Sequence, residues 1–133
     1  MNRIIAVMFT SIMLSGCVTS APSQEVLAKA DYGSSITQQD AENIAKNFLK
    51  THLKDPDSAN IEWGSIEKGW LRESRIAGFQ LRFGHILRAN INAKNSYGGY
   101  NGYKPYQFLF KNGKIICVYA ETETSDGAMW KVY

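Results

Sequence analysis

Residues 106–119 read YQFLFKNGKIICVY, two apolar runs on either side of a short polar turn. Asn112-Gly113 between such runs is the strongest short-range signal for a β-hairpin with a two-residue type I′ turn. Such a loop sets Lys111 opposite Lys114 and predicts three further pairs on one face: Phe110–Ile115, Phe108–Cys117 and Tyr106–Tyr119. Because Leu109, Ile116 and Val118 make the other face apolar too, we expect this hairpin in the middle of a sheet.

The residues upstream of this hairpin also alternate with a period of two. Asn60–Glu67 is predicted to be a strand with a bulge at Gly64, and Lys68–Ala77 is predicted to be a polar turn region. Residues 79–94 alternate over a length unusual for one strand, so we expect a bend or break near Gly84-His85. The change to a period of two predicts that this part of the chain forms the strands of an antiparallel sheet.

A helix is predicted before the strands. Thr37 is a good N-cap, Asp40 follows it at capping-box spacing, and Asp55-Pro56 ends the pattern. Apolar residues recur at spacings of three and four along one stripe: Ala41, Ile44, Ala45, Phe48, Leu49 and Leu53. The expected fold is therefore one small α+β domain, residues 36–133, in which the helix Gln38–Lys54 packs on an antiparallel sheet of about four strands.

The N-terminus has the features of an export signal. A basic start at Arg3 precedes the apolar run of residues 4–14, which at about 1.5 Å per residue is too short to cross a ~30 Å hydrocarbon core as a helix. Leu14-Ser15-Gly16-Cys17 resembles a bacterial lipobox. This resemblance implies cleavage before Cys17, a diacylglycerol on its sulfur, and a further acyl chain such as palmitate on the new amino terminus.

This interpretation divides the chain into three parts. Residues 1–16 are a predicted lipoprotein signal peptide, residues 17–35 are a lipidated Cys17 with a flexible tether, and residues 36–133 are the domain. The lipobox-like motif implies a lipid-anchored protein of the cell envelope. An Asp at position 18 would resemble an inner-membrane retention signal, so Val18 implies the outer membrane, facing the periplasm, if the source is Gram-negative.

Composition excludes some classes of partner. The formal net charge of the whole chain is +3, with 15 basic residues interleaved with 12 acidic ones and no basic cluster, which argues against a nucleic-acid partner. Two cysteines do not form a disulfide framework. If Cys17 carries lipid, Cys117 is alone, and its apolar neighbours predict a buried, inert thiol.

No constellation of catalytic residues is recognisable. His52 and His85 lie in unrelated contexts, without metal-ligand spacing, and are predicted to be a capping or rim residue and a satisfied core or bend residue. No G-x-S-x-G elbow, P-loop or G-x-G-x-x-G pattern occurs. We therefore expect no enzyme activity, no catalytic residues, no metal and no cofactor.

The unusual stretch is NINAKNSYGGYNGYKPY, residues 90–106. Tyr97, Tyr100 and Tyr103 recur at intervals of three, with glycines between them and Asn95 and Asn101 nearby. Recognition loops use these residue types, because Tyr offers rigid amphipathic area and Asn offers adaptable hydrogen bonds. The alternative is a structural loop in which glycines supply positive φ and asparagines cap the turn backbone. These five residues are the candidate binding site, with both interpretations open.

Two motifs resemble a known group of proteins. DPDSA at residues 55–59 and NAKNSYGGY at residues 92–100, followed by an aromatic strand, look like a group of small bacterial and phage-associated exported proteins. The resemblance spans about Thr37–Tyr119 and implies one small α+β domain. It implies no activity and no catalytic residues.

The sequence favours a membrane-anchored, non-enzymatic binding module of the cell envelope, with an envelope protein or glycan as partner. One alternative is an exclusion or inhibitor lipoprotein of a mobile element. A second is a small envelope hydrolase, which requires convergent carboxylates such as Glu62, Glu67 and Glu73.

Overall fold

The computed structural model describes residues 21–73, 77–121 and 129–133. The predicted signal peptide, the lipobox and Cys17 lie outside these residues. The described part contains two α-helices, a 3₁₀ turn and six strands: α1 (Gln24–Lys29), α2 (Gln38–His52), η1 (Pro56–Ser58), β1 (Asn60–Trp63), β2 (Glu67–Arg72), β3 (Leu81–Asn92), β4 (Lys104–Lys111), β5 (Lys114–Glu121) and β6 (Met129–Lys131).

The predicted fold class is wrong. The described chain is mostly β: all six strands belong to one antiparallel sheet, whereas the helices have only 6 and 15 residues. The prediction of an α+β domain with about four strands missed β2, which lies in the segment predicted to be a polar turn, and left open whether residues 129–133, where β6 lies, form a short extra strand. Both strands are short and mostly exposed or half-buried, so they lack the buried alternation that marks β3.

The sheet is a meander in the order β1-β3-β4-β5-β6, with β2 also paired to β3. β1 and β2 follow each other along the same edge of β3, and the three residues Gly64–Ile66 lie opposite only two, Leu87 and Arg88. This extra residue confirms the predicted irregularity at Gly64, whose N–H donates to the Arg88 carbonyl at 2.8 Å. However, the irregularity separates β1 from β2, whereas a single strand had been predicted over Asn60–Glu67.

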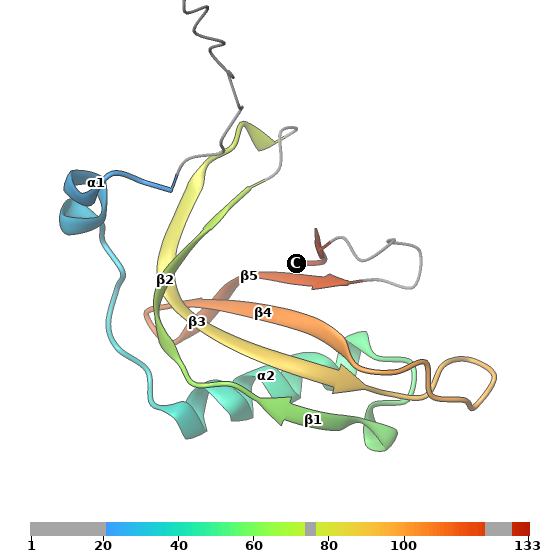
Figure 1. Ribbon diagram of the computed structural model, residues 1–133. Helices are drawn as coiled ribbons and strands as arrows, with labels where there is room; N and C mark the ends of the chain where they lie inside the picture. Colours follow the sequence, from blue (N-terminus) through green and yellow to red (C-terminus); the bar gives the residue numbers. More distant parts are fainter. Residues whose placement is uncertain (1–20, 74–76, 122–128) are drawn as a thin grey trace, which may run out of the picture.

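β3 is continuous through Gly84-His85, where the sequence predicted a bend or break. All of its 12 residues are in strand conformation, and Figure 1 shows that the strand curves along its length. A Cβ at Gly84 would collide with the carbonyl oxygen of Phe110, so the absence of a side chain lets β3 approach β4 closely. The predicted bend is therefore present as a curvature within β3, and the predicted break is not.

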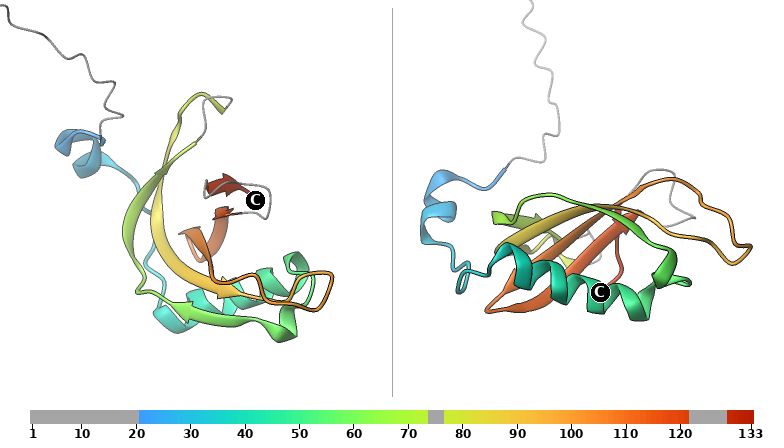
Figure 2. Two further views of the ribbon diagram at one scale, coloured as in Figure 1. Left: turned by 45° about the vertical axis from the view of Figure 1, so that its right-hand side comes forward. Right: turned by 90° about the horizontal axis from the view of Figure 1, so that it is seen from below.

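α2 lies across one face of the sheet, as the views in Figure 2 show. The Thr37 hydroxyl caps it by accepting from the Asp40 N–H at 3.1 Å, and the helix ends at His52, two residues earlier than predicted. Its buried face packs with buried side chains of β3, β4 and β5: Ala41, Ala45 and Leu49 against Leu87, Ala89, Ile91, Phe108, Phe110 and Val118. This cluster is the main core.

The central hairpin has the predicted turn but a shifted register. Phe110 pairs with Ile115 as expected, and then a bulge leaves Ile116 without a partner residue on β4. Beyond it the pairs are Leu109–Cys117, Phe108–Val118, Gln107–Tyr119 and Tyr106–Ala120. The predicted pair Phe108–Cys117 is thus wrong, because one extra residue moves every later side chain of β5 to the other face. Cys117 packs with Ile86 and Leu109 in a second, smaller cluster on the face opposite α2.

Candidate functional site

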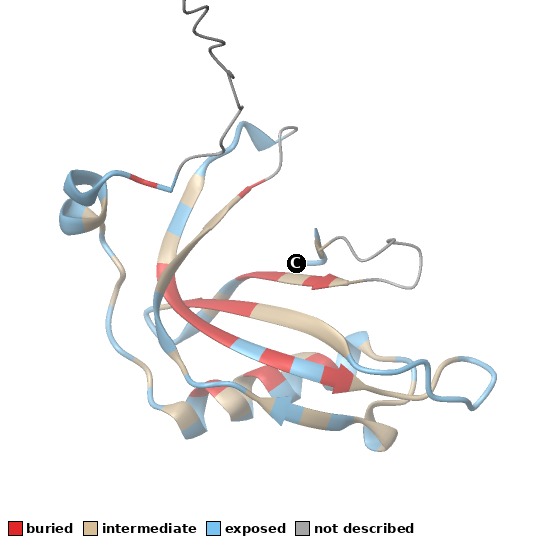
Figure 3. Cartoon of the chain, viewed as in Figure 1, coloured by how far each residue is buried: buried red, intermediate tan, exposed pale blue. Residues whose placement is uncertain are grey.

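The segment between β3 and β4, residues 93–103, carries the predicted binding residues and is called the tyrosine loop below. It projects beyond the sheet, at the opposite end of the molecule from α1 (Figure 1), and is largely exposed (Figure 3). The exposed fractions of Tyr97, Tyr100 and Tyr103 are 97%, 47% and 48%. Three aromatic side chains thus reach solvent from one loop.

Asn95 holds the tyrosine loop in shape. Its Oδ1 accepts from the backbone N–H groups of Tyr97 at 2.9 Å and Gly99 at 3.2 Å, and its Nδ2 donates to Asn101 Oδ1 at 3.0 Å. Its backbone N–H donates to the Gly99 carbonyl at 2.8 Å, and its carbonyl accepts from Gly98, which has φ +79°. The amides of Asn95 and Asn101 are therefore used within the loop, as the structural interpretation of these two residues predicted.

Tyr100 joins the tyrosine loop to the rest of the domain. Its hydroxyl donates to the Ser58 carbonyl at 2.9 Å, and the Lys94 Nζ lies 5.8 Å from its ring centroid. The Lys94 backbone N–H also donates to Ser58 Oγ at 2.9 Å. The predicted site residues thus divide: Asn95, Asn101 and Tyr100 fix the loop, while Tyr97 and Tyr103 are presented by it.

The two histidines do not form a site. His52 stacks on Phe48 with ring centroids 3.7 Å apart, and its Nδ1 lies 2.9 Å from the Phe48 carbonyl, so it closes the end of α2 as predicted. His85 is only 6% exposed, and its Nδ1 has no hydrogen-bond partner within the described part of the chain. It is a core residue, but not a satisfied one. The described residues contain no group of three His, Cys, Asp or Glu side chains that could hold a metal ion.

The carboxylates named for a hydrolase do not converge. Glu62 lies opposite Asn90, Glu67 lies opposite Ile86 and pairs with Arg88 at 3.4 Å, and Glu73 follows the end of β2. At about 3.3 Å per residue, Glu67 and Glu73 are roughly 20 Å apart along the chain. The paired-carboxylate geometry of a hydrolase is therefore not formed by these three residues.

Sequence reasoning missed a charged cluster in which the buried Glu73 meets the partly exposed Arg82 and Lys131. Glu73 is 6% exposed, and its Oε1 accepts from Lys131 Nζ and from Arg82 Nε, each at 3.1 Å. The hydrogen bond from Lys131, followed by that from Arg82, lowers the pKa of the Glu73 carboxyl below its ordinary value, although burial opposes this. The cluster ties β6 to the β2–β3 hairpin.

Cys117 lies where the sequence predicted, in the core. It is 1% exposed, and burial raises the pKa of its thiol, as expected of an inert cysteine.

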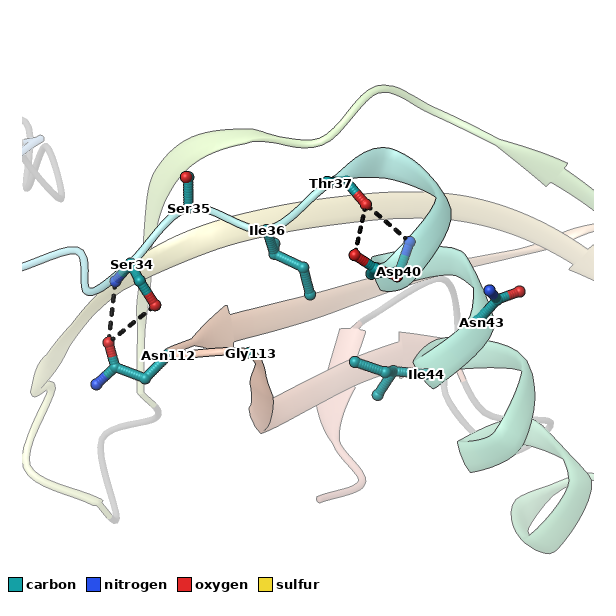
Figure 4. A pocket seen from close by; sticks show the side chains of 9 residues that line it. All are labelled: Ser34, Ser35, Ile36, Thr37, Asp40, Asn43, Ile44, Asn112 and Gly113. Carbon is teal, nitrogen blue, oxygen red and sulfur yellow. Dashed lines mark hydrogen bonds between the residues drawn. The ribbon is translucent and has the colours of Figure 1, made fainter.

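The cavity in Figure 4 has a volume of about 420 Å³ and lies beside the first turn of α2. Nine residues line it: Ser34, Ser35, Ile36, Thr37, Asp40, Asn43, Ile44, Asn112 and Gly113. Its polar groups largely bond to one another: Ser34 donates to Asn112, and Thr37 donates to Asp40 at 2.7 Å. This cavity thus lies where the segment before α2 meets the β4–β5 turn.

The fold and the loop define a small, mostly β domain that presents exposed tyrosines on an internally bonded loop. No family model, no curated protein and no solved structure matches this chain. Among the described residues, no helix is long and apolar enough to span a membrane.

Proposed function

We propose that this chain is a lipid-anchored, non-enzymatic binding module of the cell envelope, and that it contacts its partner through the tyrosine loop. The observation that carries the proposal is Tyr97, a large aromatic side chain that is 97% exposed on a loop whose backbone is bonded by Asn95. The lipobox-like sequence ending at Cys17 supports the anchor.

Preorganisation makes this loop suited to binding. Because Asn95 and Tyr100 already fix the backbone, less conformational entropy is lost when a partner binds. Tyr is enriched among residues that dominate binding energies, since it buries a large rigid area on contact. Residues 93–103 contain no carboxylate and one cation, Lys94, so aromatic and amide groups dominate the loop.

The anchor is tested by the mass of the mature protein. We expect the wild-type chain to begin at Cys17 and to carry the added mass of its acyl chains, and we expect Cys17→Ser to abolish labelling by a fatty-acid probe. A mature wild-type protein without this mass increment would contradict the anchor.

The contact surface is tested by capture from detergent-solubilised envelopes. Replacing an aromatic hot spot costs about 1–2 kcal/mol or more, which is roughly a 5- to 30-fold loss of capture. We expect this loss for Tyr97→Ala with an unchanged melting temperature. Trp130→Ala is the matched control, because Trp130 is 57% exposed but lies on β6. Equal capture by wild type and Tyr97→Ala, or equal losses in both variants, would count against the loop.

A further inference from the structure

The segment between the two helices, residues 30–36, is fastened to the sheet and is called the strap below. Asp31 forms an ion pair with Lys111 Nζ at 2.9 Å, and the Ser34 N–H donates to Asn112 Oδ1 at 2.9 Å. Gly33, with φ +71°, lies so close to the β4–β5 turn that a Cβ would come within 2.7 Å of Asn112 Oδ1. The strap is therefore bound to the tip of the central hairpin.

Tyr32 fastens the strap at a second place. Its ring packs edge-on against Phe83 with centroids 5.6 Å apart, and Lys68 Nζ lies 5.7 Å from its centroid. Its hydroxyl donates to the Leu27 carbonyl at 3.3 Å, which connects the strap to α1. Pro22, just before α1, is also buried. Contacts with the domain thus begin close to the first described residue.

These contacts shorten the free part of the predicted tether. A flexible chain of about 18 residues would give a root-mean-square reach of roughly 23 Å and would let the domain turn freely. Only three residues lie between Cys17 and Ala21, and the four Cα–Cα steps from one to the other span at most about 14 Å when fully extended. A lipid on Cys17 would therefore hold the α1 end of the domain close to the bilayer.

The tyrosine loop lies at the other end. In Figure 1 and in both views of Figure 2, α1 and the tyrosine loop are at opposite ends of the molecule. Since the strap joins α1 to the sheet and Tyr100 joins the loop to η1, the two ends belong to one packed unit.

We propose that the strap keeps α1 beside the anchoring bilayer and directs the tyrosine loop away from it, so that the loop binds a protein standing clear of that membrane. This inference rests on the proposed function, for both the anchor and the contact surface. The Tyr, Gly, Ser and Asn composition of the loop is that of protein-binding paratopes, which is why the partner is a protein.

The test places a thiol-reactive fluorophore at either end of the full-length lipidated protein, on Val26→Cys or Tyr97→Cys. Val26 is 43% exposed on α1, while Cys117 is 1% exposed and Cys17 carries the lipid, so neither native cysteine takes the label. The labelled proteins are reconstituted in phosphatidylethanolamine–phosphatidylglycerol vesicles containing a headgroup-nitroxide lipid. We expect at least threefold stronger quenching at position 26 than at position 97, and similar quenching by soluble iodide.

Loosening the strap should reduce this difference. The double variant Asp31→Ala/Tyr32→Ala removes the ion pair to Lys111 and the ring contact with Phe83, and we expect the ratio of quenching to fall toward one. Glu25→Ala is the matched control, because it breaks only the exposed Glu25–Lys29 pair within α1 and should keep the wild-type ratio. Equal quenching at both positions in the wild type, or stronger quenching at position 97, would overturn the orientation.

The outcomes separate this inference from the function on which it rests. Failure of the wild-type protein to float with the vesicles would reject the anchor and the orientation together. Flotation with equal quenching would reject the orientation alone. Chemical crosslinking from Ser96→Cys, an exposed neighbour of Tyr97, in intact envelopes then examines the partner: crosslinks to lipid alone would overturn the inference, and crosslinks to a protein would support it.

Discussion

β4 and the tyrosine loop are adjacent in the chain and similarly rich in aromatic residues, yet the aromatic side chains of β4 are mostly buried and those of the loop are exposed. In β4, Phe108 and Phe110 are fully buried, and the Tyr106 ring stacks on Phe108 with centroids 5.9 Å apart. Burial also raises the pKa of the Tyr106 hydroxyl. In the loop, Tyr97 is 97% exposed and Tyr103 is 48% exposed.

Spacing explains the difference. Aromatic residues two apart in β4 point to the same face of the sheet, where α2 covers them. Tyrosines three apart, separated by glycines, do not share a strand face, and positive φ at Gly98 and Gly102 takes the backbone out of strand geometry. Aromatic residues that follow Lys104, in β4, therefore lie in the hydrophobic core, whereas those that precede it, in the tyrosine loop, lie at the surface.

The largest expected effect on stability is in β4, where the aromatic side chains are buried. Phe108→Ala should lower the free energy of unfolding by about 3–5 kcal/mol, because it removes a fully buried ring that packs against Phe48 of α2 and Trp63 of β1. Urea denaturation of the purified protein measures the change. A loss under 1 kcal/mol would mean that Phe108 does not lie in the core.

A smaller effect is expected where β3 approaches β4. Gly84→Ala places a methyl group against the Phe110 carbonyl and should destabilise the protein by about 1–3 kcal/mol. Gly99→Ala is the control in the tyrosine loop, where a Cβ would meet only Asn95 side-chain atoms, at 3.9 Å or more, and the change should stay within about 0.5 kcal/mol. Equal melting temperatures of the two variants would contradict this account of the curved strand.

The smallest effect distinguishes two tyrosines of the same loop. Tyr100→Phe removes the hydrogen bond to the Ser58 carbonyl and should cost about 0.5–1.5 kcal/mol. Tyr97→Phe should leave stability unchanged within about 0.5 kcal/mol, because the side chain is exposed. Differential scanning calorimetry of both variants gives the comparison, and a reversed order would show that Tyr97 carries a structural contact.

Part of the fold was predictable because its signals are local. The Asn112-Gly113 turn and the capped start of α2 at Thr37 depend on neighbouring residues alone, and both are confirmed. The bulge at Ile116 was not predictable, since residues 115–118 are apolar at every position and either register buries apolar side chains. The strand count failed for a related reason: β2 and β6 are edge segments without a strong alternating pattern.

The candidate site was predictable in composition but not in roles. The Tyr, Gly and Asn pattern located the loop, and the glycine positions indicated a departure from strand geometry. The pattern could not show that the side chains of Asn95 and Asn101 bond to each other within the loop. Nor could it show that the Tyr100 hydroxyl bonds to the Ser58 carbonyl, because these two residues are 42 positions apart in the chain. The strap was missed for the same reason: Asp31 and Lys111 meet only after the sheet has formed.

The strand order has a consequence for how the domain assembles. From β2 to β6, each strand pairs with its neighbour in sequence, so every pairing closes a short stretch of chain. Each of these pairings forms between neighbouring strands, so little loop-closure entropy is lost as it forms. β1 and α2 are the exceptions: β1 pairs with β3, and the buried face of α2 packs on Phe108 and Val118, far downstream. A chain that emerges N-terminus first therefore carries a helix whose apolar face is uncovered until β5 is complete, and in that interval we expect α2 to be the preferred target of holdase chaperones and proteases.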